Sequence, residues 1–172
     1  MENKTLNLIK TRVSCRSYSE KKVSLKKALM IAEAGKYAPS GKNRQIVNIY
    51  LINSKRNIEK LRKLSLKLLN RDCMYDAKTI LLVGGPRGDK FTDLDGSCVL
   101  ENLFLAAHAL KINTCWINQF DELLSTIDGL KVKKALGIPE DDRIVGSCIL
   151  GYAKDPNVLK VKERKEDFIK IL

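Results

Sequence analysis

The chain has 172 residues, 44% of them hydrophobic and 30% charged, which corresponds to a single globular domain over 1–172. This composition excludes intrinsic disorder, and 10 glycines with 4 prolines are too few for a collagen-like chain. The 32 Lys and Arg residues against 20 Asp and Glu residues give a formal net charge of +12, so we expect an anionic ligand or partner. A nucleic-acid-binding module ranks last among the candidate classes, because the cations are dispersed and only 6% of residues are aromatic.

The cysteine and histidine content argues against disulfides and metal sites. The five cysteines form no CxxC pair and stand at Cys15, Cys73, Cys98, Cys115 and Cys148. His108 is the single histidine, so neither a catalytic triad nor a histidine-based zinc site has enough members. We therefore expect reduced thiols, no metal and a cytoplasmic protein. The start of the chain lacks an apolar signal region and no segment approaches about 18 consecutive apolar residues, so no membrane partner is expected.

The first predicted elements are two helices followed by a loop. A short amphipathic helix is expected over 2–10, and Ser24 is placed as the N-cap of a second helix. That helix must stop near Ala38, because Pro39 disfavours helical geometry in the residue before it. The composition of 39–43 indicates a loop.

The middle of the chain predicts strand, helix and strand. Residues 46–52 are β-branched and aromatic enough for a strand. The helix that follows carries Ile58, Leu61, Leu64 and Leu68 on one face. Residues 79–83 form a continuous apolar run, typical of a strand covered on both faces, which Gly84-Gly85-Pro86 should end.

The last part of the chain predicts a buried helix and two further strands. Residues 96–110 are apolar nearly all round, so this helix should be buried on several sides. Strands are expected over 112–117 and 143–150, with a short helix over 130–136 between them. The tail 154–172 is charged but ends in Phe168, Ile169, Ile171 and Leu172, so we expect it to dock on something, such as a second subunit. The pattern predicts an α+β fold with helices on both sides of a sheet.

Most generic motifs fail in this sequence. Residues 84–90 follow a strand but fit neither the Walker A nor the dinucleotide-binding pattern, so a surface turn is the better interpretation. Cys98, Cys115 and Cys148 lie in apolar contexts, where cysteine is usually inert. Cys15 lies beside a cation that could lower its pKa, but no base is identifiable for a nucleophilic role.

Three separated polar clusters remain. Residues 12–16 place two guanidinium groups and a hydroxyl in one short segment, suited to phosphate oxygens. Residues 39–45 supply two amides that could bind the edge of a heterocycle. Residues 162–164 add further cations near the end of the chain.

In this order, the clusters resemble those of the nitroreductase family of flavoproteins. The landmarks are the RxSxR segment, the APSGxNxQ loop, Asp95-Gly96-Ser97 before an apolar helix, Thr114 to Phe120, and Gly151-Tyr152 before a basic tail. The collinear match spans almost the whole chain and looks like a compact member. It implies a nitroreductase-like fold with a central, mostly antiparallel sheet flanked by helices, in a homodimer whose subunits exchange terminal segments. The tail 154–172 would then dock on the partner subunit.

The resemblance also implies FMN held non-covalently at the dimer interface. Its phosphate would be bound by Arg12, Ser14, Lys162 and Arg164, with Val13 as an apolar neighbour.

The flavin ring would contact both subunits. The implied ring contacts are Arg16, Pro39, Ser40, Gly41, Asn43, Gln45, Asn70, Trp116, Ile117, Asn118 and Gln119. Those from 39–45 would come from the partner, with Gln45 supporting the loop, and Asn70 would bind the pyrimidine edge. The backbone N–H groups near Asn118 and Gln119 would reach N5 and O4. Arg16 would face N1 and the C2 carbonyl, where a fixed cation favours the reduced flavin.

The implied activity is that of an FMN-dependent NAD(P)H oxidoreductase. Hydride would be exchanged through flavin N5 in ping-pong fashion, and the acceptor would be a nitroaromatic, a quinone or a similar electron-poor molecule. Arg16, Asn118 and Gln119 are the residues assigned catalytic roles. The alternative is an FMN-binding protein of the same fold with little or different turnover.

Overall fold

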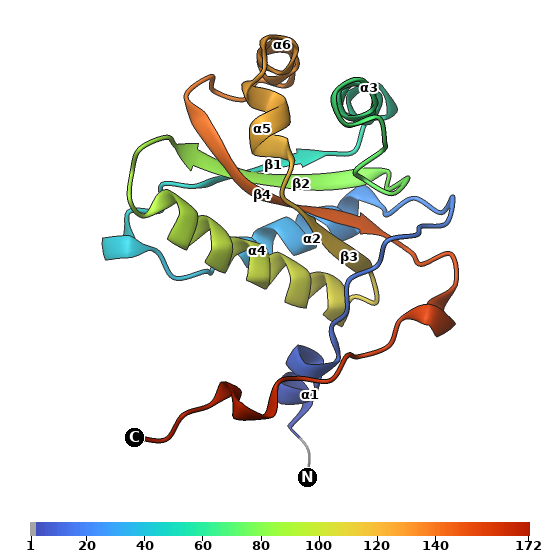
Figure 1. Ribbon diagram of the computed structural model, residues 1–172, viewed down its shortest axis with the longest axis vertical. Coiled ribbons are helices and arrows are strands. Elements are labelled where there is room, and N and C mark those ends of the chain that lie inside the picture. Colours follow the sequence, from blue (N-terminus) through green and yellow to red (C-terminus); the bar gives the residue numbers. More distant parts are fainter. Residues whose placement is uncertain (1–2) are drawn as a thin grey trace.

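A four-stranded antiparallel sheet forms the centre of the computed structural model, which describes residues 3–172 (Figure 1). The strands are β1 (Asn48–Ile52), β2 (Thr79–Pro86), β3 (Asn113–Ile117) and β4 (Asp142–Gly151). Their order is β1-β2-β4-β3, and every neighbouring pair is antiparallel. The predicted α+β class and antiparallel sheet are therefore confirmed.

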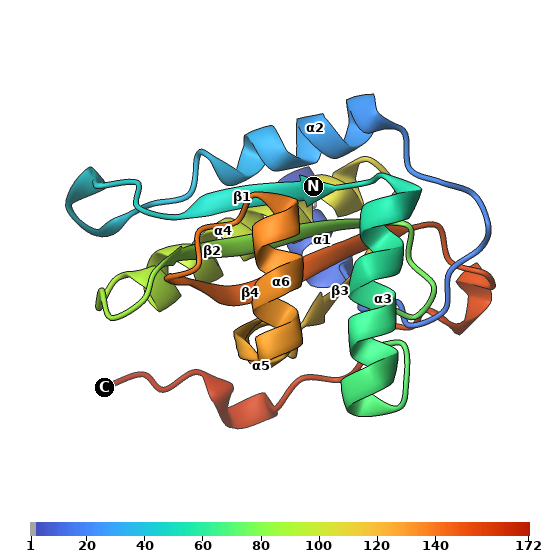
Figure 2. The same ribbon diagram turned by 90° about the horizontal axis from the view of Figure 1, so that it is seen from above.

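Helices cover both faces of this sheet (Figures 1 and 2). One face carries α2 (Leu25–Gly35) and α4 (Thr92–Ala109), and the other carries α3 (Lys55–Leu69), α5 (Phe120–Ser125) and α6 (Ile127–Leu136). Each face has its own apolar cluster. Along β2, Ile80 and Leu82 belong to one cluster and Leu81 and Val83 to the other, as the two-residue period of a strand requires.

The two ends of the chain lie beyond the helical layer of α2 and α4. Helix α1 (Lys4–Thr11) packs against α4, and the tail runs past α1 through the short turns Pro156–Val158 and Glu166–Phe168 (Figure 1). Residues 160–172 are all exposed, including the four apolar residues at the end of the tail. No helix among residues 3–172 is long and apolar enough to cross a membrane.

The prediction that Gly84-Gly85-Pro86 ends the second predicted strand is wrong. These residues belong to β2, and Gly84 and Gly85 are buried. A β-bulge lies between Val83 and Gly84, where a Cβ on Gly84 would come within 2.6 Å of the Arg143 carbonyl oxygen. The glycines therefore mark a close approach of two strands, and the surface turn comes later, at 87–88.

Helix α4 differs from its prediction at its start and in its burial. It begins at Thr92, which places Asp93 and Asp95 in its first turn, where carboxylates suit the helix dipole. Leu94 and Cys98 are exposed, so one side of the helix is open and the expected apolar surroundings of Cys98 are wrong.

Other corrections concern the ends of elements and one helix that was not predicted. Helix α2 stops at Gly35, three residues before the predicted limit, and β1 starts at Asn48 because Gln45 has a left-handed φ of 51°. Leu68, expected on the buried face of α3, is 40% exposed. Helix α5 was not predicted, because six residues are too few to show a helical period.

Candidate functional site

A small pocket gathers most of the predicted phosphate-binding residues. It has a volume of about 180 Å³ and is lined by Arg12, Val13, Ser14, Arg16, Lys160, Lys162 and Arg164. These residues come from the segment after α1 and from the tail, about 150 positions apart in the chain. We call this the basic pocket.

The backbone fixes both walls of the basic pocket. Arg12 leaves α1 with an extended conformation, and Ser14 forms a parallel bridge with Thr114 at the start of β3. The Cys15 amide donates to the Thr114 carbonyl at 2.8 Å, and the Cys15 side chain is buried. Because side chains alternate along an extended segment, Ser14 and Arg16 face the pocket on either side of buried Cys15.

The tail is attached to the same segment before it reaches the pocket. The Ser19 amide donates to the Tyr152 carbonyl at 2.8 Å, and the Lys154 amide donates to the Ser17 carbonyl at 3.0 Å. Tyr18 and Ala153 form an antiparallel bridge between these two bonds. The basic end of the chain therefore starts from a fixed point beside 12–16.

The charge of the basic pocket is not neutralised by any ion pair with residues 3–172. None of its five cationic side chains forms an ion pair with another residue of 3–172, and no acidic side chain lines the pocket. Bringing cations together without counter-charge is unfavourable unless an anion binds between them. Arg and Ser side chains offer the donors that phosphate oxygens accept.

Sequence reasoning missed Lys160 as a member of this pocket. Lys160, Lys162 and Arg164 are spaced by two, and Val161 and Glu163 between them do not line the pocket. In an extended segment this spacing puts the three cations on one side. The alternation in the printed sequence was the signal that could have found Lys160.

An aromatic pair lies next to the basic pocket. The Arg12 guanidinium lies 5.7 Å from the centre of the Phe104 ring, and that ring lies 5.9 Å from the Trp116 ring. The Trp116 indole N–H donates to the Asn118 side-chain oxygen at 3.4 Å. Trp116 is 38% exposed, so one side of this pair is accessible to a ligand.

The other predicted ring contacts, at the end of β3 and at Asn70, differ in how far their side chains are exposed. Asn118 is exposed, and Gln119 is half-buried at the N-cap of α5. The Ile117 side chain is 2% exposed within the core, and its carbonyl accepts a hydrogen bond from the Ser147 hydroxyl. Any contribution of Ile117 to a cofactor site is therefore limited to its backbone. Asn70 is exposed at the left-handed C-cap of α3 and does not line the basic pocket.

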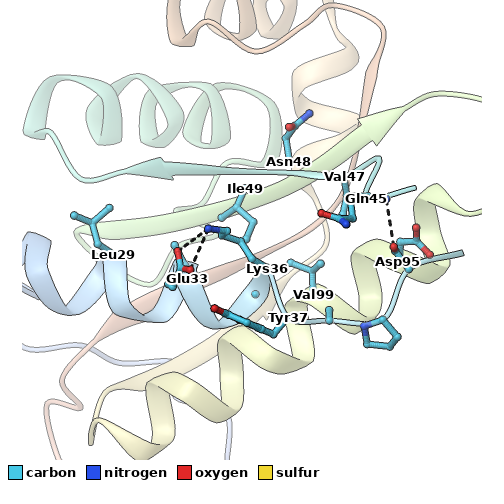
Figure 3. Close-up of a pocket in the computed structure, with 15 residues that line it drawn as sticks. Leu29, Glu33, Lys36, Tyr37, Gln45, Val47, Asn48, Ile49, Asp95 and Val99 are labelled. Carbon is cyan, nitrogen blue, oxygen red and sulfur yellow. Dashed lines mark hydrogen bonds and ion pairs between the residues drawn. The ribbon is translucent and has the colours of Figure 1, made fainter. Parts of the chain in front are cut away.

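The 39–45 loop belongs to a second, larger pocket at the other end of α4 (Figure 3). This pocket has a volume of about 550 Å³, and Pro39, Ser40, Gln45 and Asp95 are among its lining residues. Figure 3 shows Gln45 and Asp95 between the end of α2, the start of β1 and the first turns of α4. We call it the loop pocket.

The loop carries unusual backbone strain for residues other than glycine. Lys42, Asn43 and Gln45 have φ values of 57°, 54° and 51°. The two predicted amide groups bond to each other, the Gln45 side chain donating to the Asn43 side-chain oxygen at 3.0 Å. Such left-handed residues cost free energy and are held where neighbouring structure imposes them, commonly at functional sites.

The two pockets are attached to opposite ends of α4. The Gly41 amide donates to Asp95 near the start of α4, whereas Thr11 bonds to His108 near its end. At 1.5 Å per residue, Asp95 and His108 lie roughly 20 Å apart along the helix. The predicted phosphate contacts and the predicted loop contacts are thus brought to opposite ends of α4.

Burial disfavours the reactive thiolate form of the four buried cysteines. Burial raises the pKa of the Cys15, Cys73, Cys115 and Cys148 thiols, which disfavours the reactive thiolate. All five cysteines are free, and no group of side chains in 3–172 has the composition of a metal site.

A family model and a curated relative both match this chain over most of its length. The family model described as "Nitroreductase family" matches residues 9–72 and 63–152. A curated protein of Archaeoglobus fulgidus, with the proposed name NADH dehydrogenase/NAD(P)H nitroreductase, is 30% identical over 157 residues, covering 87% of this chain and 86% of its own.

Two solved structures are similar over the whole fold. A nitroreductase with bound FMN from Bacteroides fragilis is 30% identical with a TM-score of 0.91, over 99% of this chain and 100% of its own. A nitroreductase with bound FMN from Desulfitobacterium hafniense, 24% identical with a TM-score of 0.89 over all of both chains, shares the fold.

Proposed function

This chain belongs to the nitroreductase family, and from that premise we propose that it is an FMN-dependent NAD(P)H oxidoreductase acting on nitroaromatics, quinones or similar electron-poor acceptors. The observation that carries the proposal is the basic pocket, in which Ser14 lies among five cations that form no ion pair with residues 3–172. Its charge and hydroxyl fit the phosphate of a mononucleotide, and the relative from Bacteroides fragilis binds FMN.

The chain's own residues have distinct roles in this proposal. FMN, when bound, supplies reversible hydride exchange at N5 between NAD(P)H and a second substrate. Arg12, Ser14, Lys162 and Arg164 hold the phosphate. Arg16 keeps a positive charge beside the N1 and O2 edge, which favours the reduced cofactor and raises its potential. The backbone around Asn118 and Gln119 donates toward N5 and O4.

The separation of the two pockets supports a shared site in a homodimer. The loop is attached to α4 at Asp95, and the segment before the basic pocket is attached at His108, roughly 20 Å further along the helix, so in this proposal the loop that lines the flavin comes from a second copy. Exposed apolar side chains on the same side of the sheet, on α1, α2 and α4, provide surface for such a contact: Leu6, Ile9, Leu29, Met30 and Leu94. The tail, whose last apolar residues are exposed, would dock on that partner. Five free cysteines are consistent with a cytoplasmic protein.

The central test measures FMN and riboflavin binding by wild type and Arg12→Ala. Removing one charge-assisted phosphate contact should weaken FMN binding about 10- to 100-fold, because such bonds contribute about 1.5–3 kcal/mol. Riboflavin lacks the phosphate, so its affinity should be the same for both proteins. Arg56→Ala, which removes an exposed cation that does not line the pocket, is the matched control and should bind FMN as wild type does.

The outcomes separate the possible readings. A wild-type protein that stays colourless with excess FMN would overturn the proposal. Equal loss of FMN and riboflavin in Arg12→Ala would show that the phosphate lies elsewhere. With FMN bound, anaerobic NADH or NADPH should bleach the yellow colour, and an added quinone should restore it. Persistent colour with both donors would instead indicate a flavin-binding protein with little turnover.

A further inference from the structure

A buried carboxylate joins the 39–45 loop to α4. The Asp95 Oδ1 atom accepts a hydrogen bond from the Gly41 amide at 2.9 Å, and Asp95 is only 4% exposed. Gly41 itself lies against Phe91, since a Cβ at this position would meet the ring at 2.5 Å. The bond therefore attaches the middle of the loop to the first turn of the helix.

The loop needs such an attachment. Its three left-handed residues other than glycine lie at Lys42, Asn43 and Gln45, directly after Gly41. Each of these conformations is unfavourable for a residue that has a Cβ, so an unrestrained loop would leave them. The other hydrogen bonds of these residues join the loop only to itself: the Asn43 amide donates to the Ser40 carbonyl at 3.0 Å, the Arg44 amide to the Gly41 carbonyl at 3.2 Å, and Gln45 bonds to the Ser40 and Asn43 side chains.

A second polar contact joins the loop to the rest of the protein, but it is a weaker ion pair because it is partly exposed to water. Arg44 pairs with Asp89 at 2.7 Å, but these side chains are 40% and 24% exposed. Ion pairs in such surroundings contribute little because water screens them. The Asp95 bond is shielded from water and is made to the backbone, so it restrains the loop irrespective of side-chain motion.

Asp95 also has a feature that packing does not explain. Its Oδ2 atom is buried and accepts no hydrogen bond from any residue of 3–172, while Asp95 lines the loop pocket. Leaving an acceptor buried and unpaired costs stability, and such costs are tolerated mainly where a site requires the group. An apolar residue of similar size would avoid this cost but could not hold Gly41.

We propose that Asp95 is a positioning residue, which holds the 39–45 loop in the strained conformation that lines the flavin. The statement that the loop lines a flavin rests on the proposed function. The attachment of the loop to α4 does not depend on any ligand. Asp95 touches neither the cofactor nor the reacting atoms in this assignment. It acts through Gly41 and through the residues that follow it.

The test compares two substitutions of similar volume. Asp95→Asn keeps an oxygen that can accept from the Gly41 amide, whereas Asp95→Leu keeps the size and accepts nothing. In the FMN-free full-length protein, hydrogen exchange of the amides of 41–45 should be about tenfold faster or more in Asp95→Leu. Asp95→Asn should stay within about threefold of wild type. FMN affinity should follow the same order, and riboflavin affinity should fall with it because the loop contacts the ring.

A matched control lies two residues away. Asp93→Leu removes an exposed carboxylate from the same helical turn, and should leave exchange in 41–45 and flavin affinity unchanged. Unchanged loop exchange in Asp95→Leu would overturn the inference, even if wild type binds FMN. Equal loss in Asp95→Asn and Asp95→Leu would also overturn it, since charge rather than the bond to Gly41 would then be responsible. A wild type that binds no flavin would defeat the proposed function while the exchange data still decide the role of Asp95.

Discussion

His108 shows how one side chain can join an element to a ligand pocket. Its Nε2 atom lies 2.9 Å from the Thr11 hydroxyl, so it links the end of α4 to the last turn of α1. Arg12, the next residue after Thr11, lines the basic pocket. Partial burial, followed by the nearby charge of Arg12, lowers the pKa of His108 below its ordinary value of about 6.5. The imidazole is thus kept neutral next to a cluster of cations.

This pKa predicts a pH dependence of stability. The folded state binds the His108 proton less tightly than the unfolded state, so below about pH 6.5 the unfolded state takes up more protons. Stability is therefore full above that pH and decreases as the pH falls through the window down to the folded pKa. The free energy of unfolding, measured with urea, should decrease more in wild type than in His108→Gln as the pH is lowered from 8 to 5. Parallel curves for the two proteins would contradict the assigned pKa shift.

Helix α4 is the element that organises the site. It contacts α1, α2 and strands β2, β3 and β4, and it presents Asp95 at one end and His108 at the other. Its close approach to β4 depends on Gly96, where a Cβ would lie 2.7 Å from a Val145 methyl group. Val145 is β-branched and packed, so it cannot easily move aside.

Gly96→Ala should therefore destabilise the protein in spite of a better helix propensity. Overpacking costs about 1–3 kcal/mol, and alanine recovers about 1 kcal/mol in a helix interior. We expect a net loss of about 1 kcal/mol in the free energy of unfolding by urea. Ser97→Ala, on the exposed side of the same turn, reports propensity without the clash and should cause no such loss. A more stable Gly96→Ala would mean that β4 and α4 are less tightly packed than described.

At the scale of the whole molecule, the proposed shared site depends on two separate pockets in each chain. The basic pocket and the loop pocket lie at opposite ends of α4, so two copies related by a two-fold axis could each complete the other's site. This arrangement would make flavin binding and dimerisation mutually dependent, because each ligand would contact both copies. The exposed apolar residues of the tail and of the open side of α4 would provide surface for the same contact between copies.

Mixing two defective proteins tests the shared site. Arg12→Ala damages the basic pocket and Gly41→Ala forces the loop away from the Phe91 ring. After the subunits are exchanged, about a quarter of all sites should be intact, since half of the dimers are mixed and each has one undamaged site. FMN binding measured by fluorescence should recover in the mixture. No recovery in mixed dimers verified by native mass spectrometry would indicate that each site lies within one chain.

The sequence by itself determined the class of fold and most of the chemistry of the basic pocket. Alternating and helical periods are local consequences of backbone geometry, so residues such as Ser24 at an N-cap and Ile80 to Val83 in a strand could be assigned without a structure. The cationic and hydroxyl groups of 12–16 and 162–164 follow from residue type alone.

Only the tertiary structure decided where these groups meet. It brought Lys160 to the pocket, turned the Ile117 side chain into the core and separated the loop from the phosphate contacts by the length of α4. It also placed Asp95 under Gly41 and gave Lys42, Asn43 and Gln45 their left-handed conformations. These features depend on contacts between residues far apart in the chain, and a local hydrophobic period shows which face of an element is buried but not which distant residues it meets.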